Sequence, residues 1–388
     1  MDEHFDRGPH DVPDGDDSLA RELADELAEE LADELADELG YDLEDDAGLT
    51  VDGRISTGYL PDPGDVRAAV VDGYEQFRDV DEGTVPDYIP ALAAAPADAF
   101  GVCVAGVNGG IVAIGDAEVE FTIQSISKVF VFALVCDALG HQEARRKLGV
   151  NSTGLPFDSV MGIELNAART MNPMVNAGAL ATTSLVPGRT REEKFARIAE
   201  GLSRFAGRRL EVDEAVYQSE VATNFRNRGI AHLLYGYRRM YSDPELATDV
   251  YTRQCALRVT ARDLAVMGAT LADGGMNPLT KERTVGQGVC RRVLAVLATS
   301  GLYERSGDWL YDVGLPGKSG VSGGLVTVSP GKGGVGTYAP PLDRAGNSVR
   351  GQRITTYLSE RLGLNLFSSA PLGQPPRTTD AAALVPGA

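Results

Sequence analysis

The stretch Gln124-Ser125-Ile126-Ser127-Lys128-Val129-Phe130 sets both the fold and the chemistry that this chain can support. Ser125 and Lys128 lie three residues apart, and an apolar run follows them through Leu139. Residues i and i+3 share one helix face, so the hydroxyl and the amine are predicted to meet in the first turn of a buried helix. Burial lowers the pKa of an amine because its charged form loses hydration. Lys128 could then accept the proton of Ser125 and create a nucleophile without a histidine.

A second motif downstream supports a catalytic role for this pair. On its own, a Ser-x-x-Lys motif also arises by chance, as a capping serine followed by a lysine that reaches solvent. Lys318-Ser319-Gly320 lies just before a strand-like run at 325–328, and penicillin-recognising serine enzymes carry the two motifs in this order. Ser127 lies two residues after Ser125, on another helix face, and is the weaker candidate for the nucleophile.

The negative charge of the chain is concentrated at one end. The 388 residues carry a formal net charge of −20, and residues 1–50 contain 20 acidic residues and two arginines. That leaves a net charge of only −2 on the remainder, so the acidity belongs to one segment rather than to a salt-adapted surface. Because no excess of lysine or arginine is available to neutralise phosphates, we expect no nucleic-acid partner.

Cysteine spacing and hydropathy indicate the cellular compartment of the protein. Cys103, Cys136, Cys255 and Cys290 are scattered without a C-x-x-C pair, so we expect small buried hydrophobic side chains rather than disulfides or zinc ligands. The N-terminus lacks the basic and apolar regions of a signal peptide, and no run of about 18 apolar residues occurs. We therefore expect a soluble, cytoplasmic protein with no membrane partner.

Both ends of the chain are predicted to lie outside the folded domain. Residues 1–64 form an acidic low-complexity tail and linker, in which leucine recurs every fourth residue from Leu19 to Leu39. Such a stripe drifts about 40° per step around a helix, too fast for a coiled-coil seam. We expect a solvated helix or a disordered tract there. Residues 368–388, rich in serine, proline and alanine, are expected to be a flexible tail.

Residues 65–367 have the composition of a globular domain. An amphipathic helix is expected at 66–77, and a hairpin at 101–114 around Asn108-Gly109-Gly110. Helical patterns then dominate from 125 to about 300, and strands are expected at 309–313, 324–328 and 335–338. This order predicts a sheet built from both ends of the domain, with a helical insertion between them.

Further motifs extend over the same region. They occur in the following order: Asp87-Tyr88-Ile89-Pro90, Asn172-Pro173-Met174-Val175-Asn176-Ala177-Gly178-Ala179, Ser219-Glu220 with Arg226-Asn227, Tyr251 before Gln254-Cys255, Ser300-Gly301-Leu302-Tyr303, Gly314 through Gly324, and Pro340-Pro341-Leu342-Asp343 with Gly346-Asn347-Ser348. Together with the two motifs above, this series resembles the serine-dependent glutaminase family. The resemblance implies an α/β (α+β) fold like that of serine beta-lactamases, with an antiparallel sheet flanked by helices and a helical subdomain.

The resemblance also implies a reaction and a set of catalytic groups. Glutamine would be hydrolysed to glutamate and ammonia through an acyl-serine intermediate, which requires a nucleophile, a proton donor for ammonia and donors for the oxyanion. By resemblance, Ser125 is the nucleophile, Lys128 its base and Tyr303 the proton relay. The backbone N–H groups of Ser125 and Val321 would form the oxyanion hole. Lys318 is expected to shape the site or its charge rather than to act as a base.

Substrate contacts are implied at eight positions: Tyr88, Ser125, Asn176, Glu220, Asn227, Tyr251, Tyr303 and Val321. Glu220 would face the α-ammonium group of glutamine, and the asparagine and tyrosine donors would hold its α-carboxylate. Each of these residues also has a simpler explanation when taken alone. Asn176 could be a turn former beside Pro173, Tyr88 a packed aromatic, and Glu220 a helix cap or a surface acid.

Two other functions are compatible with part of the pattern. A beta-lactamase or peptidase of the same fold would share the Ser-x-x-Lys and Lys-Ser-Gly motifs, but would have no reason to carry Asn176, Glu220 and Asn227. A non-catalytic glutamine-binding protein would be expected to lack Ser125 or Lys128, and both are present.

A histidine-dependent hydrolase is not expected. Residues 320–324 fit the pattern G-x-S-x-G, but a strand-like segment follows them where a nucleophile elbow requires a helix. No metal-ligand cluster or nucleotide-binding loop occurs in the sequence, so no cofactor is expected. The expected partner is the small molecule L-glutamine, and the resemblance implies a homodimer or homotetramer.

Overall fold

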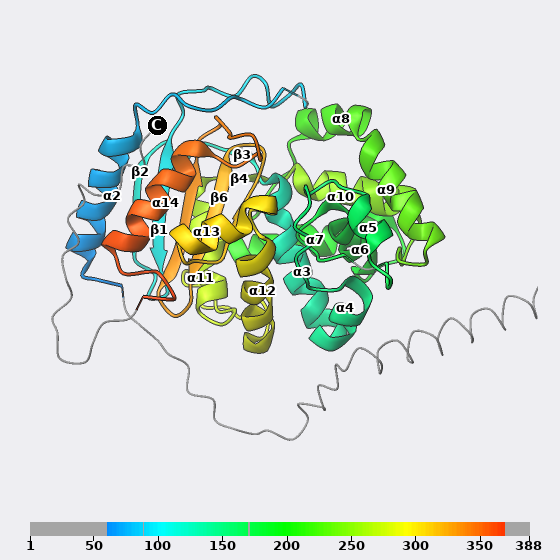
Figure 1. The fold of residues 1–388 in the computed structure, drawn as a ribbon. Helices are drawn as coiled ribbons and strands as arrows, with labels where there is room; N and C mark the ends of the chain where they lie inside the picture. Colours follow the sequence, from blue (N-terminus) through cyan, green and yellow to red (C-terminus); the bar gives the residue numbers. More distant parts are fainter. Residues whose placement is uncertain (1–59, 88, 170, 369–388) are drawn as a thin grey trace, which may run out of the picture. The chain divides into compact units, whose positions relative to one another are not determined.

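The computed structural model describes residues 60–87, 89–169 and 171–368 (Figure 1). The chain divides into two units, 1–55 and 56–388, and every described residue belongs to the second unit. Tyr88 lies outside the described residues, as do nearly all of the predicted tails at 1–64 and 368–388.

An antiparallel five-stranded sheet forms one part of the described structure. Its order is β2-β1-β7-β6-β5, and its strands are β1 (Gly101–Gly106), β2 (Ile111–Gly115), β5 (Gly317–Ser319), β6 (Gly324–Ser329) and β7 (Gly333–Tyr338). The two strands before the helical block join the three strands after it through the pairing of β1 with β7, in which Val104 lies opposite Val335. The prediction of a sheet built from both ends of the domain is confirmed, as are the hairpin at 101–114 and the strands at 324–328 and 335–338.

Helices cover both faces of this sheet. On one face, α2 (Pro63–Phe77) and α14 (Val349–Arg361) pack side by side over Val102 and Val104 of β1 (Figure 1). On the other face, α11 (Ala261–Ala272) packs against Cys103 and Ala105. Successive residues of a strand point to opposite faces, so the unbroken apolar run of β1 reflects burial on both sides.

Close approach between α11 and the sheet depends on the glycines of β7. A Cβ atom at Gly336 would lie 2.0 Å from the carbonyl oxygen of Ala261. Any side chain at this position would therefore push the helix off the strand. The N-terminus of α11 is fixed by a capping box between Thr260 and Asp263, which satisfies two backbone N–H groups.

The helical block lies between the two halves of the sheet in sequence and forms a second layer beside it (Figure 1). Its elements are α3 (Ser127–Leu139), α4 (His141–Leu148), α5 (Met161–Leu165), α6 (Asn176–Leu185), α7 (Arg191–Ala206), α8 (Glu214–Thr223), α9 (Phe225–Gly236), α10 (Pro244–Cys255) and α12 (Gln287–Ser300), with a short pair of strands, β3 (Phe121–Thr122) and β4 (Arg258–Val259). Every residue of α3 from Ser127 to Ala133 is buried. The predicted buried helix and helical subdomain are both confirmed.

One expected strand is wrong. Residues 309–313, read as a strand from their aromatic and branched side chains, overlap α13 (Ser306–Asp312). Trp309 and Val313 are buried while Tyr311 is exposed, which is the spacing of one helix face rather than of a strand. Trp309 also donates from its indole nitrogen to the carbonyl oxygen of Leu315 at 2.7 Å.

The four cysteines are buried and free, as expected. Within the described ranges, no helix is both long enough and apolar enough to cross a membrane.

Candidate active site

The Ser125–Lys128 pair lies where the sheet meets the helical block. Ser125 belongs to a 3-10 turn, η1 (Gln124–Ile126), that leads directly into α3. Lys128 is only 1% exposed. Burial lowers the pKa of its ammonium group to about 8, although nearby Cys255, Glu220 and Asp158 favour the charged form. The lowered amine pKa predicted from the sequence is thus present.

Two asparagines continue a chain of hydrogen bonds that begins at Lys128. The Lys128 ammonium donates to Asn176 Oδ1 at 2.7 Å and to the carbonyl oxygen of Met174 at 3.4 Å. Asn176 Nδ2 in turn donates to Asn227 Oδ1 at 2.9 Å. Asn176 begins α6 and Asn227 lies in the first turn of α9. Three predicted site residues from three helices therefore form one hydrogen-bonded chain.

Tyr303 is a third predicted catalytic residue beside Ser125. It opens the 3-10 turn η2 (Tyr303–Arg305) with a positive φ of 58° and is 4% exposed. The Tyr303 hydroxyl interacts with the Ser125 side chain and donates to the carbonyl oxygen of Ser319 at 3.4 Å. Burial raises the pKa of Tyr303 to about 12, so its phenol remains protonated at neutral pH.

The Lys318 side chain packs against the ring of Tyr303. Its Nζ atom lies 4.0 Å from the centroid of the Tyr303 ring and donates to the Ser319 carbonyl oxygen at 2.8 Å. Burial and the neighbouring Lys128 ammonium hold the pKa of Lys318 well below its usual range. The charge on Lys128 would repel a second charged amine here, so it disfavours protonation of Lys318.

Glu220 presents a carboxylate from α8. It is 7% exposed, and burial raises its pKa to about 7 against the opposing effects of a Gln124 hydrogen bond and the Lys128 charge. Its Oε2 atom is buried and has no hydrogen-bond partner in the described part of the chain. A buried carboxylate oxygen without a donor is costly, and a cationic ligand group would relieve that cost.

Gln124 is a site residue that the sequence did not single out. It adopts a positive φ of 48°, and its side chain donates to Glu220 and, at 3.2 Å, to Thr122 Oγ1. Its place directly before Ser125 was the only signal available. Neither the strained backbone nor the contact with Glu220 can be read from local sequence.

Tyr251 and Cys255 occupy the same face of α10. Tyr251 is 3% exposed, and its pKa is raised well above its usual value by burial, with nearby Cys255 and Glu220 adding to the effect. The Tyr251 hydroxyl also interacts with the Cys255 thiol. The Ser127 hydroxyl donates to the Gln124 carbonyl oxygen at 2.8 Å and lies 3.9 Å from the Cys255 sulfur.

Val321 lies in the turn between β5 and β6. A Cβ atom at the adjacent Gly320 would come within 3.0 Å of the Ile123 carbonyl oxygen and 3.3 Å of Ile126 Cγ1. The absence of a side chain at Gly320 thus allows this turn to lie against the one that carries Ser125. A strand follows the turn, so residues 320–324 are not a nucleophile elbow.

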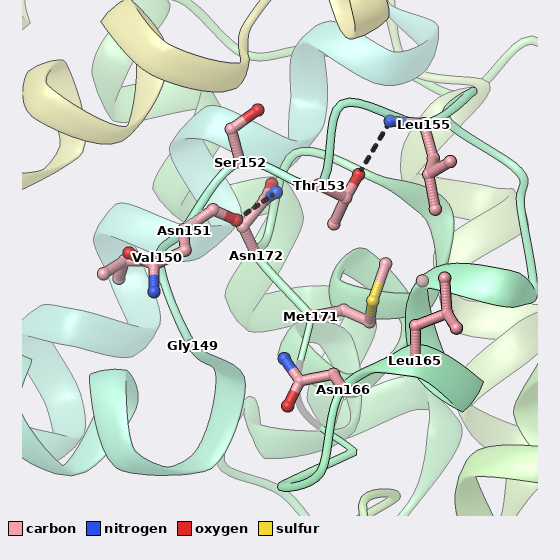
Figure 2. Close-up of a pocket in the computed structure, with 11 residues that line it drawn as sticks. Gly149, Val150, Asn151, Ser152, Thr153, Leu155, Leu165, Asn166, Met171 and Asn172 are labelled. Atoms are coloured by element: carbon pink, nitrogen blue, oxygen red, sulfur yellow. Dashed lines mark hydrogen bonds between the residues drawn. The ribbon is translucent and has the colours of Figure 1, made fainter. Parts of the chain in front are cut away.

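A cavity of about 380 Å³ lies apart from these groups (Figure 2). Residues of 149–155 and of 162–172 line it, among them Asn172. Asn172 donates to the Asn151 carbonyl oxygen at 3.0 Å and accepts from the Met174 backbone N–H at 2.9 Å. No group of three or more histidine, cysteine or acidic residues suited to a metal ion occurs in the chain as described.

Comparison with known proteins identifies the family. The sequence model of glutaminase matches residues 83–367. The chain belongs to the glutaminase family. Glutaminase 2 of Yersinia pestis is 58% identical over 327 residues, which cover 84% of this chain and 96% of that protein.

Solved glutaminase structures share the fold. A probable glutaminase, YbaS, superposes with a TM-score of 0.78 at 44% identity, over 79% of this chain and all of that one. The Bacillus subtilis glutaminase YbgJ, in a covalent complex with 5-oxo-L-norleucine formed from 6-diazo-5-oxo-L-norleucine, has a TM-score of 0.71 at 32% identity over 78% of this chain and 99% of that one. The predicted beta-lactamase-like fold is thus confirmed for this glutaminase-family chain.

Proposed function

We propose that the protein is an L-glutamine amidohydrolase that forms glutamate and ammonia through an acyl-serine intermediate on Ser125. The observation that carries this proposal is the buried Lys128 amine, with a pKa of about 8, one turn from a serine. The names of its relatives support glutamine as the substrate.

Lys128 is arranged to act as a base when neutral. A neutral amine has two N–H groups and one lone pair. Asn176 Oδ1 and the Met174 carbonyl oxygen are acceptors for the two N–H groups, which leaves the lone pair for the Ser125 proton. The Ser125 oxygen would then attack the amide carbon of glutamine, while the backbone N–H groups of Ser125 and Val321 stabilise the oxyanion.

Tyr303 completes the proton path. Its phenol is protonated at neutral pH and in hydrogen-bond contact with Ser125, so it can donate to the departing nitrogen. The Lys128 ammonium returns a proton to the tyrosine, and ammonia leaves. Water then attacks the acyl-serine, with the same groups acting in reverse order to release glutamate and restore Ser125.

The substrate's charged groups have matching partners. The unpartnered Oε2 of Glu220 is suited to the α-ammonium group of glutamine. Because Asn227 accepts from Asn176 through Oδ1, its own amide N–H groups can donate to the α-carboxylate. We assign Tyr251 to the same carboxylate, and Tyr88 to substrate binding by family resemblance alone.

We also propose that the enzyme is a cytoplasmic homodimer or homotetramer, as the resemblance implies.

The test is an ammonia-release assay with glutamine, alongside asparagine and a chromogenic cephalosporin. Ammonia from glutamine alone is expected. Faster turnover of the cephalosporin would instead favour a beta-lactamase, and binding of glutamine without ammonia release would favour a binding protein.

The nucleophile is tested by labelling with 6-diazo-5-oxo-L-norleucine. Peptide mass spectrometry is expected to locate one adduct on Ser125, with none in Ser125→Ala and full labelling in the matched control Ser127→Ala. An adduct on any other residue would reject the assignment.

A further inference from the structure

The segment 79–98 has unusually little structure of its own. Its described residues contain no helix or strand and only one isolated bridge, between Thr84 and Leu342. Structureless loops longer than about 12–15 residues are uncommon in compact domains and are usually functional. In Figure 1 the segment crosses from the end of α2 to α8, where the Ala91 backbone N–H donates to Ser219 Oγ at 3.4 Å.

One buried side chain holds the two ends of this segment together. Arg350, the second residue of α14, is 2% exposed. Its Nη1 atom donates to the carbonyl oxygens of Arg78 at 3.3 Å and Asp98 at 3.1 Å. Its Nη2 atom donates to those of Ala97 at 2.6 Å and Ala99 at 2.9 Å. All four terminal N–H groups of the guanidinium thus join the two ends of the segment.

The middle of the segment packs against two elements that carry proposed site residues. Ile89 and Leu92 form a buried apolar cluster with Val216, Val321 and Leu342. Val321 carries a proposed oxyanion donor, and Val216 lies one helical turn before Glu220 on α8. The segment therefore touches both the turn that would stabilise the transition state and the helix that would bind the α-ammonium group.

Resting on the proposed function, we propose that Arg350 is a positioning residue for glutamine hydrolysis, which fixes segment 79–98 so that Ile89 and Leu92 hold the Val321 turn and α8 in register. The guanidinium geometry is essential to this role. A lysine ammonium keeps the charge but offers three N–H groups on one nitrogen, which cannot span four carbonyl oxygens from both ends of the segment.

Arg350→Met and Arg350→Lys test this role, with Lys194→Met as the matched control. Lys194 is also a buried cation that donates only to backbone carbonyl oxygens, those of Ser184 and Val186, and it belongs to α7, away from the cluster. Kinetics are measured at a temperature at which circular dichroism shows each variant folded.

We expect Arg350→Met to lower kcat/KM for glutamine by about tenfold or more, with kcat falling and KM rising together. Arg350→Lys should show a smaller loss of the same kind. Hydrogen exchange should rise in both variants at 79–98, at 216–220 and around Val321. Lys194→Met should melt earlier but keep kcat/KM within about twofold of the wild type.

A folded Arg350→Met variant with wild-type kinetics, or with losses no greater than those of Lys194→Met, would reject the positioning role. So would a failure of both Arg350 variants to fold under conditions in which Lys194→Met folds. If the wild type releases no ammonia, the proposed function fails instead, and hydrogen exchange still decides whether Arg350 orders the segment.

Discussion

Replacing Glu220 by glutamine should move stability and activity in opposite directions. Burial raises the pKa of Glu220 from 4.5 to about 7, so ionisation costs more in the folded protein than in the unfolded chain. The stability associated with the protonated carboxyl is present below pH 4.5 and is lost as the pH rises through 7. Glutamine resembles the protonated acid in shape and charge and does not pay this cost.

The size of the stability effect follows from the pKa shift of Glu220. At about 1.4 kcal/mol per pKa unit, ionised Glu220 destabilises the substrate-free protein by about 3 kcal/mol at pH 8. The same relation gives less than about 1 kcal/mol at pH 5, where the carboxyl is protonated in the folded protein and about three-quarters ionised in the unfolded chain. Glu220→Gln is therefore expected to stabilise the protein at pH 8 and to have little effect at pH 5.

Activity should fall in the same variant. Leaving the α-ammonium group without its buried partner costs about 3–5 kcal/mol, which corresponds to a loss of at least about a hundredfold in kcat/KM. N-acetylglutamine, which has no ammonium group, should be a poor substrate for the wild type.

Denaturant titrations at pH 5 and 8, with ammonia-release kinetics at pH 8, measure both effects. Glu214→Gln, the same change on the exposed side of α8, is the control and should alter neither quantity appreciably. A Glu220→Gln variant that is equally stable at pH 8 and retains glutamine turnover would refute the reasoning.

Three further outcomes are expected. Ser125→Ala should abolish turnover in a folded protein, while Ser127→Ala retains most of it; steady-state kinetics decide. Lys128→Arg keeps a positive charge but cannot release its proton, so it should be as inactive as Lys128→Ala, and an active Arg variant would mean that Lys128 supplies only charge. Removing residues 1–54 should leave kcat and the melting temperature unchanged, because the family match begins at residue 83; a drop in either would show that the acidic segment contributes to the folded enzyme.

Short-range relations could be predicted from the sequence, and long-range ones could not. The pairing of Ser125 with Lys128 follows from helix geometry alone, and the low amine pKa follows from the apolar run after it. The contact between Gln124 and Glu220, in contrast, joins residues on two separate elements. Nothing in either local sequence specifies that contact or the positive φ of Gln124.

The error at 309–313 has a similar origin. Trp309, Tyr311 and Val313 have strand-forming side chains, but this preference is weak and yields to packing. The buried partners of Trp309 are supplied by distant parts of the chain. The clamp formed by Arg350 depends on carbonyl oxygens more than 250 positions earlier, and a side chain that binds backbone leaves no complementary residue in the sequence to reveal it.

The pairing of β1 with β7 also shapes how this chain emerges during synthesis. β1 is complete long before its partner β7 exists, because the whole helical block is translated between Val104 and Val335. At about 5–20 residues per second, that delay is on the order of 10–50 s. Throughout it, the apolar strand Gly101–Gly106 has an open edge without a charge or a proline, the kind of segment that pairs with neighbouring chains. The nascent protein should therefore depend on chaperone binding near β1. A lysine introduced into this strand would reduce aggregation of the nascent chain, but it would also weaken the finished sheet.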